Sequence, residues 1–351
     1  MIPPSDPERQ NIEETTHFPE TSEDDVEQVE NAIELKEVEG ISQTRLVLRR
    51  FVRHKAAMIS LFVFLGVVGL AFSSIGIDAM GIKTPGWWQF NSVAIYDLLD
   101  GGVPSATHPF GQDEVGHDIF AQVMRGTQQS LMIVFVAGIV ATLLGVLVGS
   151  IAGFFRGRID QLLMRFTDAI IIIPVLVITA VLGSTFNRSG SFVLAIVLGL
   201  VLWTGMSRLV RGDVLSLRER EYVDAARVAG ASNSRIIFRH ILPNAIGVII
   251  VNATLVMSAT ILTEAAVSFL GFGVQFPDVS LGSLIHNFQT AFNTRPWLFW
   301  WPGLFIIIIA LTINFIGDGL RDAFDPRQKR GLNRVARKQR TVVRPAEEVG
   351  A

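Results

Sequence analysis

Residues 126–155 read GTQQSLMIVFVAGIVATLLGVLVGSIAGFF, a run without Asp, Glu, Lys or Arg. A membrane-spanning helix needs about 20 mostly apolar residues. In hydrocarbon each backbone N–H and C=O must be paired within the segment, so a run of this kind is predicted to be a helix. Five more charge-free runs lie at 56–77, 169–187, 189–207, 241–263 and 296–317. They predict an all-α, polytopic membrane protein with six transmembrane helices.

The composition supports this class. Half of the 351 residues are hydrophobic and 18% are charged, whereas soluble domains have about 25% charged residues. Buried helices of a large soluble protein would not account for six such long runs. The sequence contains no cysteine, which excludes disulfides, thiolate metal sites and cysteine nucleophiles.

Basic residues at the ends of the runs predict the orientation. Lys and Arg concentrate in 45–55, 156–165, 208–239 and 321–344, and are sparse in 78–125, 187–190 and 272–296. The sparse segments are predicted to face outward, so that both termini are cytoplasmic. The predicted organisation is a leader (1–40), an interfacial helix with the first span (41–80), an extracytoplasmic loop (81–125), a five-helix core (126–320) and a cytoplasmic tail (321–351).

The two ends of the chain differ in charge. Residues 1–40 contain 13 acidic and two basic residues, a net charge of −11, and are expected to be disordered. This leader is either an inert solvated extension or a partner-binding tail. Residues 41–55 mix Leu and Phe with basic residues and predict an interfacial amphipathic helix with a bend before the first span. The start of the spanning helix itself is the alternative. Neither end indicates nucleic-acid binding.

Residues 219–244 read EREYVDAARVAGASNSRIIFRHILPN, a polar, arginine-rich segment between two apolar runs. Two short helices are predicted here, the first over 221–229. Gly230 permits the turn between them, and Ser232 or Asn233 is a plausible N-cap. Pro243 is expected to end the second helix and begin the next span.

This segment resembles the EAA loop of ABC importer permeases, the cytoplasmic loop that docks on the ATPase. The resemblance implies a type I ABC importer permease fold in which the EAA loop (219–244) seats in a groove of an ATP-binding subunit. The residues that carry this expectation are Glu221, Asp224, Ala225, Ala226, Arg227, Gly230, Arg235, Leu242 and Pro243. A solvated cytoplasmic helix pair without a docking role is the alternative.

A second segment, residues 108–131, reads HPFGQDEVGHDIFAQVMRGTQQSL. It is similar to the H-P-x-G-T-D-x-x-G-R-D-x-x-S-R-x-x-x-G-x-R-x-S-L stretch of the dipeptide, oligopeptide and nickel ABC importers, in their C-type permease subunit. It departs from that pattern at Gln112, His117, Ala121, Gln122 and Gln128. The predicted role is a structured external lip built on His108, Gly111, Asp113, Gly116 and Asp118, with Asp113 and Asp118 capping the next helix. A metal site from His108, Asp113, His117 and Asp118 is a weaker alternative.

Two more stretches extend the resemblance, ILTEAAVSFLGFG at 261–273 and GDGLRDAFDPR at 317–327. Glu264 in the first is the one acid in its apolar run. Glu264 is 20 residues after Asn244, and the rise of an α-helix over that length places its side chain near the outer headgroup level. It is expected to cap or pair at the outer end of the fifth span, beside the translocation path, and direct contact with substrate is the alternative.

The resemblance implies a permease subunit of an ATP-driven peptide importer in a prokaryotic inner membrane. The partners it implies are the lipid bilayer, a B-type permease, two ABC ATPases and an extracytoplasmic binding protein. The chain has no G-x-x-x-x-G-K-[ST] phosphate loop, so ATP and Mg are expected on the ATPases, with no cofactor or metal on this non-catalytic chain. Nickel–chelate, glutathione or oligosaccharide are alternative cargoes. An intramembrane enzyme and a non-transporting scaffold are remote alternatives.

Overall fold

The computed structural model describes residues 43–79, 82–186, 190–275 and 278–324. The chain divides into two units between Leu46 and Val47, and the description below concerns the described residues of the second unit and the helix that crosses this boundary. The predicted leader (1–40), and all of the predicted tail beyond residue 324, lie outside the described residues.

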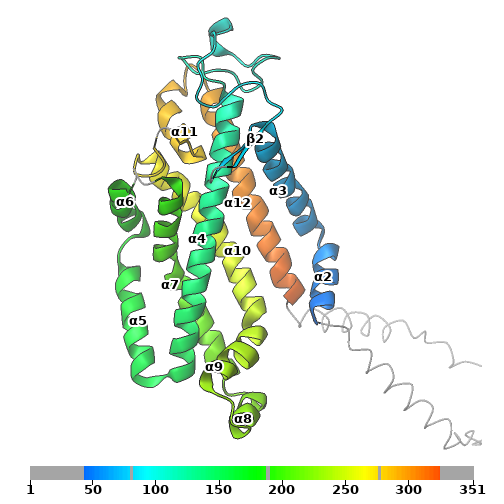
Figure 1. Ribbon diagram of the computed structural model, residues 1–351, viewed down its shortest axis with the longest axis vertical. Coiled ribbons are helices and arrows are strands. Elements are labelled where there is room, and N and C mark those ends of the chain that lie inside the picture. Colours follow the sequence, from blue (N-terminus) through cyan, green and yellow to red (C-terminus); the bar gives the residue numbers. More distant parts are fainter. Residues whose placement is uncertain (1–42, 80–81, 187–189, 276–277, 325–351) are drawn as a thin grey trace, which may run out of the picture. The chain divides into compact units, whose positions relative to one another are not determined.

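Five helical segments of the described chain are long and apolar enough to cross a membrane (Figure 1). They are α3 (Lys55–Ser74), α4 (Ile119–Phe155), α7 (Ser191–Leu217), α12 (Trp297–Phe324), and a continuous segment, Asn233–Phe269, that ends in α10 (Leu242–Phe269). A sixth span would consist of α5 (Gly157–Ile172) and α6 (Val175–Phe186), which are bent by 83°. The predicted class, a helical protein with several membrane spans, is confirmed, whereas the count of six spans and the orientation stay predictions.

The prediction of a single helix over residues 169–187 was wrong. α5 ends at Ile172, and Ile173 is extended, with φ −78° and ψ 125°. Pro174 follows, and a residue before proline is sterically driven out of the α region. The charge-free run therefore covers only the end of α5, the bend and α6.

Among the described helices, α4 and α7 share the most extensive contact. Gly145, Gly149 and Gly153 follow one another at four-residue intervals and share one face of α4. A Cβ at Gly149 would lie 2.5 Å from the carbonyl oxygen of Ser207, and a Cβ at Gly153 would lie 2.8 Å from that of Arg211. Small residues at this spacing let two membrane helices approach to backbone distance.

Other helices complete the bundle. α10 packs against α4 and α12, and α3 packs against α12. α2 (Gln43–Arg53) precedes α3, and the extended backbone of His54 (φ −81°, ψ 97°) separates them. The Nδ1 of His54 accepts the Ala57 N–H at 3.1 Å and so caps α3. The predicted bend is present, and an interfacial position for α2 stays a prediction.

Short elements connect the spans. A hairpin of β1 (Gly76–Ala79) and β2 (Ile82–Pro85), paired antiparallel, follows α3 and was not predicted. α4 begins at Ile119, before the predicted start of its span. The remaining elements are η2 (Asp100–Gly102), α8 (Glu221–Val228), α9 (Asn233–Arg235), η4 (Ile236–Ile241), α11 (Leu281–Phe288) and η5 (Gln289–Ala291).

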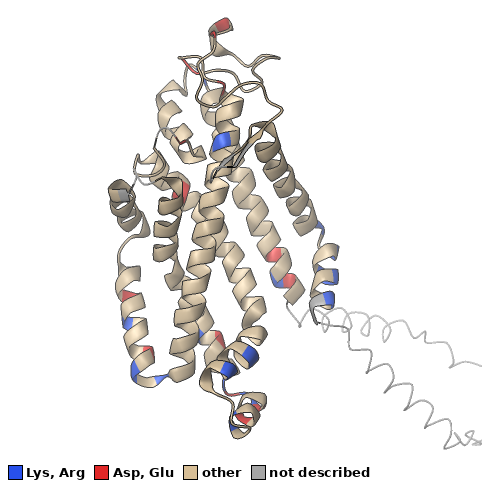
Figure 2. Ribbon diagram, viewed as in Figure 1, with Lys and Arg blue, Asp and Glu red and all other residues tan. Residues whose placement is uncertain are grey.

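Charged side chains gather away from the middle of the spans. Figure 2 shows Lys and Arg on α8 and on the lower half of α5, near the turn from α4. α8 and the loops that precede α4 lie at opposite ends of the bundle (Figure 1). The chain therefore has two candidate functional regions, one at each end of α4.

Candidate functional site

The EAA loop forms a compact helical hairpin at one end of the bundle. α8 ends at Val228, one residue before the predicted boundary, and Gly230 turns the chain with φ +77°. Only glycine takes this conformation without steric cost. The hydroxyl of Ser232 accepts the Arg235 N–H at 3.4 Å and caps α9. The predicted turn and one of the two predicted caps are therefore present.

Pro243 lies in the first turn of α10, as predicted, but it does not end the preceding helix, in contrast to the prediction. Helical structure runs from Asn233 to Phe269, and the turn directly before the proline is a π-helix, Ile236–Ile241. In it the Leu242 N–H bonds to the carbonyl of Ile237, five residues back. A proline inside an α-helix clashes with the carbonyl four residues earlier, and the wider π-turn relieves that clash.

One side chain anchors α8 to the bundle. Val223 is fully buried and packs in a cluster with Phe154 of α4 and with residues of α7, η4 and α10. Ala226 and Leu242 pack against the same cluster. The face of α8 opposite to Val223 does not contact this cluster, and its Val228 is 90% exposed. The other predicted docking residues on this surface are Glu221, Asp224, Ala225, Arg227, Gly230, Arg235 and Pro243, all exposed.

Arg227 is held in place on that surface. Its Nη1 donates to Oδ1 of Asp224 at 2.9 Å, an i,i+3 pair on α8. Such exposed pairs contribute little to stability, about 0.3–0.5 kcal/mol on a helix. Their effect here is to fix a charged, exposed helix face.

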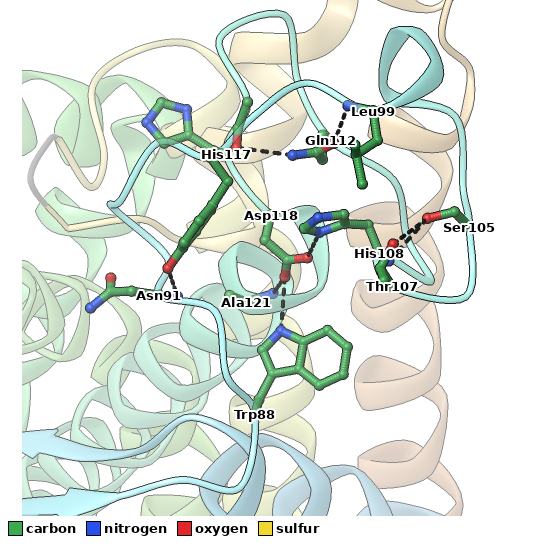
Figure 3. Close-up of polar contacts among 12 residues, drawn as sticks. Trp88, Asn91, Leu99, Ser105, Thr107, His108, Gln112, His117, Asp118 and Ala121 are labelled. Carbon is green, nitrogen blue, oxygen red and sulfur yellow. Dashed lines mark hydrogen bonds and ion pairs between the residues drawn. The ribbon is translucent and has the colours of Figure 1, made fainter.

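The lip lies at the other end of α4 (Figure 3). Asp118 is the N-cap of α4 and accepts the Ala121 N–H at 2.7 Å. The same carboxylate contacts His108 Nδ1 at 2.6 Å and accepts the indole N–H of Trp88 at 3.0 Å. Asp118 and His108 are buried, so this carboxylate ties two preceding loop segments to the helix.

Asp113 does not cap α4, in contrast to the prediction. Its Oδ1 accepts three consecutive backbone N–H groups, from Val115, Gly116 and His117, at 2.8–3.0 Å. Its Oδ2 contacts His117 Nδ1 at 2.7 Å. The carboxylate closes a turn on itself because its short side chain reaches the next residues' amides. Among the described residues, no group of three or more His, Asp or Glu is placed to hold a metal ion.

The two lip glycines stand where backbone segments touch. Gly111 has φ +80°, and a Cβ there would lie 2.6 Å from the carbonyl oxygen of Gly102. Gly116 has φ +105°, and its Cβ would lie 2.1 Å from that of Tyr96. Next to Gly111, Phe110 stacks on Trp301 of α12 with ring centroids 3.9 Å apart. The lip is thus a packed structure joined to two spans.

Gln112 and Gln128, which depart from the family pattern, form hydrogen bonds with backbone groups elsewhere in the chain. Gln112 accepts the Leu99 N–H at 3.0 Å and donates to the Asp97 carbonyl at 3.1 Å. Gln128 donates to the carbonyls of Ala71 and Gly76, at 2.8 and 2.7 Å, and so joins α4 to the end of α3. Neither role was predicted, because the partners lie far away in the sequence.

Glu264 is buried where α4, α10 and the start of α11 meet. It is 0% exposed. Oε2 accepts the hydroxyl of Ser130 at 3.0 Å, and Oε1 accepts that of Ser268 at 2.8 Å. Ser130 in turn accepts the Leu281 N–H at 3.2 Å, at the first residue of α11. The carboxylate therefore pairs with hydroxyls near the end of α10, and its place beside a translocation path stays a prediction.

Replacement of Asp118 by Ala is expected to lower the stability of the chain. Loss of an N-cap costs about 0.5–2 kcal/mol, and the buried His108 and the half-buried Trp88 would each lose an acceptor. Thermal unfolding of the detergent-solubilised chain measures the loss. Glu114→Ala is the matched control, because Glu114 is an exposed acid of the same segment. Equal melting temperatures for the two variants would contradict this role of Asp118.

Comparison with known proteins gives the same family along most of the chain. Residues 145–330 match the model of the binding-protein-dependent transport system inner membrane component, and residues 42–77 match that of the N-terminal TM domain of oligopeptide transport permease C. The oligopeptide transport system permease protein OppC of Mycobacterium tuberculosis (strain ATCC 25618 / H37Rv) is 37% identical over 300 residues, 85% of this chain and 99% of that protein.

A second oligopeptide permease gives the same family. OppC of Escherichia coli (strain K12) is 35% identical over 303 residues, 86% of this chain and 97% of that protein. Among solved structures, the inward-facing MetNI methionine ABC transporter is 19% identical, with a TM-score of 0.49, over 58% of this chain and 97% of that one. By its family models and its relatives, the chain belongs to the family of binding-protein-dependent transport system inner membrane components, multi-pass permeases of ABC transporters.

Proposed function

We propose that this chain is a permease subunit of an ATP-driven peptide importer and forms half of its translocation path. The oligopeptide permeases named above support peptides as the cargo. The observation that carries the coupling role is the form of α8, a short helix on which Val223 is buried, Ala226 packs beside it and the other residues are exposed.

In this proposal α8 docks into a groove on an ABC ATPase. The exposed Val228 supplies an apolar contact, and Arg227 and Arg235 lie on the exposed surface where they would meet acidic groups. ATP-driven closure of two ATPases then moves two permeases against one another. The chain itself carries no phosphate-binding loop, so ATP and Mg belong to those partners.

The opposite end is assigned to the binding protein that delivers the cargo. The α8 end is then cytoplasmic, in agreement with the distribution of Lys and Arg in the sequence. The lip faces outward, where its packed backbone offers a preformed surface. A second, B-type permease completes the path, since this chain has one EAA loop and one set of spans.

Charge reversal at Arg227 and loss of the Gly230 turn are expected to abolish ATPase recruitment. Arg227→Glu inverts the docking surface, and Gly230→Pro cannot keep φ +77°. Membrane insertion should stay normal, because neither residue lies in a span. The measurement is the amount of ATPase that copurifies with the tagged chain from gently solubilised membranes, identified by mass spectrometry.

The matched control is Arg165→Glu, which reverses an exposed arginine in the middle of α5. It should recruit ATPase as the unmodified chain does. Normal recruitment by both EAA-loop variants would refute the docking assignment. If the unmodified chain copurified with no second permease, ATPase or binding protein, the importer proposal itself would fall.

A further inference from the structure

The C-terminal end of α4 is held by residues that flank the EAA loop. Nη1 of Arg218, the residue directly after α7, donates a hydrogen bond to the carbonyl of Phe154 in the last turn of α4. The last carbonyls of a helix have no partner within it, and a basic side chain there also interacts favourably with the helix dipole. Arg218 therefore caps α4 from another helix.

A second contact at this end of α4 is an ion pair. Arg156, directly after α4, forms an ion pair with Glu219 at 2.6 Å, and Glu219 also lies 3.4 Å from Arg218. Arg156 has φ +56°, a left-handed conformation that a non-glycine residue adopts only when its surroundings hold it there. Glu219 is thus the one carboxylate in contact with both arginines among the described ion pairs.

The ring of Phe154 provides the third contact. The guanidinium groups of Arg218 and Arg227 each lie 5.9 Å from its centroid, within the range of a cation–π interaction. Phe154 is also buried in the cluster that holds Val223 of α8. A displacement of α8 must therefore act on the last turn of α4.

The charges in this region depend on one another. Burial lowers the pKa of the Arg218 guanidinium below its ordinary value, and the positive charge of Arg156 acts in the same direction. The carboxylate of Glu219 opposes this effect. Removing the charge of Glu219 would leave neighbouring guanidinium groups to repel one another across the junction.

We propose that Phe154, Arg156, Arg218 and Glu219 form a clamp that transmits the motion of α8 to α4. α4 is one continuous helix of 37 residues, and its other end carries Asp118 of the lip and Ser130 of the Glu264 junction. None of the clamp's four residues lies on α8 itself (Glu221–Val228), and Arg227 of the docking face contacts the clamp through the ring of Phe154. The clamp consists of positioning residues and rests on the proposed importer function.

The test uses the complete transporter reconstituted in proteoliposomes with its binding protein. Glu219→Gln removes the charge and keeps the shape, and Glu219 is 59% exposed, so the variant should fold. Arg218→Gln removes the cap of α4. Each variant is measured for copurified ATPase, for ATP hydrolysis and for uptake of a labelled peptide. Arg165→Gln on α5 and Asp318→Asn on α12 are controls at exposed sites outside the clamp, the EAA loop and the lip.

We expect both clamp variants to recruit ATPase and hydrolyse ATP, while peptide uptake per ATP hydrolysed falls by about three- to tenfold. Glu219→Asp keeps the charge and should retain most of the uptake. Unchanged uptake per ATP in both clamp variants would overturn the clamp. Loss of ATPase recruitment would also overturn it, since the residues would then act in docking. Failure of the unmodified chain to recruit ATPase would instead contradict the proposed function.

Discussion

Replacement of Gly149 by Leu is expected to force α4 away from α7 and to remove most of the folded chain. A Cβ at this position meets the carbonyl oxygen of Ser207 at 2.5 Å, the Val210 Cβ at 2.9 Å and the Arg211 nitrogen at 3.1 Å. Two of these atoms belong to backbone, so no side-chain rotation can relieve the overlap. Overpacking of a close-packed core typically costs 1–3 kcal/mol, and a backbone collision should exceed about 3 kcal/mol.

Gly205 provides the control, because it lies on α7 and a Cβ there meets no atom within 4 Å. Gly205→Leu should fold like the original chain, since glycine is roughly 0.8–1.0 kcal/mol less favourable than alanine in a helix and leucine ranks just below alanine. Gly149→Ala should be intermediate. The yield of monodisperse protein in mild detergent and its melting temperature distinguish the three. A Gly149→Leu chain as stable as Gly205→Leu would disprove the tight α4–α7 packing.

The helical spans were predictable because membrane burial leaves a simple signal. A charge-free run of about 20 residues has few other structural solutions in hydrocarbon. The bend at Pro174 carries a signal too, the residue pair Ile173-Pro174 inside a charge-free run. The β1–β2 hairpin has no comparable signal, because its strands have four residues each and lie beside the long loop.

The local features of the EAA loop and the lip followed from residue type, and their long-range contacts did not. Gly230 and Ser232 act through their own backbone, so their turn and cap were readable from the sequence. The caps of α4 differ in this respect. Asp118 acts on the next residues along the chain, whereas Arg218 reaches Phe154 across 64 positions. The close approach of α4 and α7 could have been predicted from the four-residue spacing of Gly145, Gly149 and Gly153. The pattern of charge-free runs does not show that spacing.

Replacement of Glu264 by Ala is expected to destabilise the chain by about 2–4 kcal/mol, because the buried hydroxyls of Ser130 and Ser268 both lose their acceptor and each unsatisfied group costs about 1–3 kcal/mol. Glu264→Gln keeps the side-chain volume and one acceptor oxygen, so its loss should be smaller. Melting temperatures in detergent measure both, with Glu114→Ala as the control at an exposed acid.

A double-variant cycle then tests whether the carboxylate acts through Ser130. In Glu264→Ala the hydroxyl of Ser130 is left without its acceptor, so removing that hydroxyl as well should cost less than Ser130→Ala costs alone. The double variant is therefore expected to fall short of the sum of the single losses by about 1 kcal/mol, within the range for residues in direct contact. Strict additivity would mean that Glu264 stabilises α10 by itself. A shortfall would mean that one buried carboxylate holds α4, α10 and the start of α11 together, since Ser130 also accepts the Leu281 N–H. Any motion of α4 would then reach α11 through this junction.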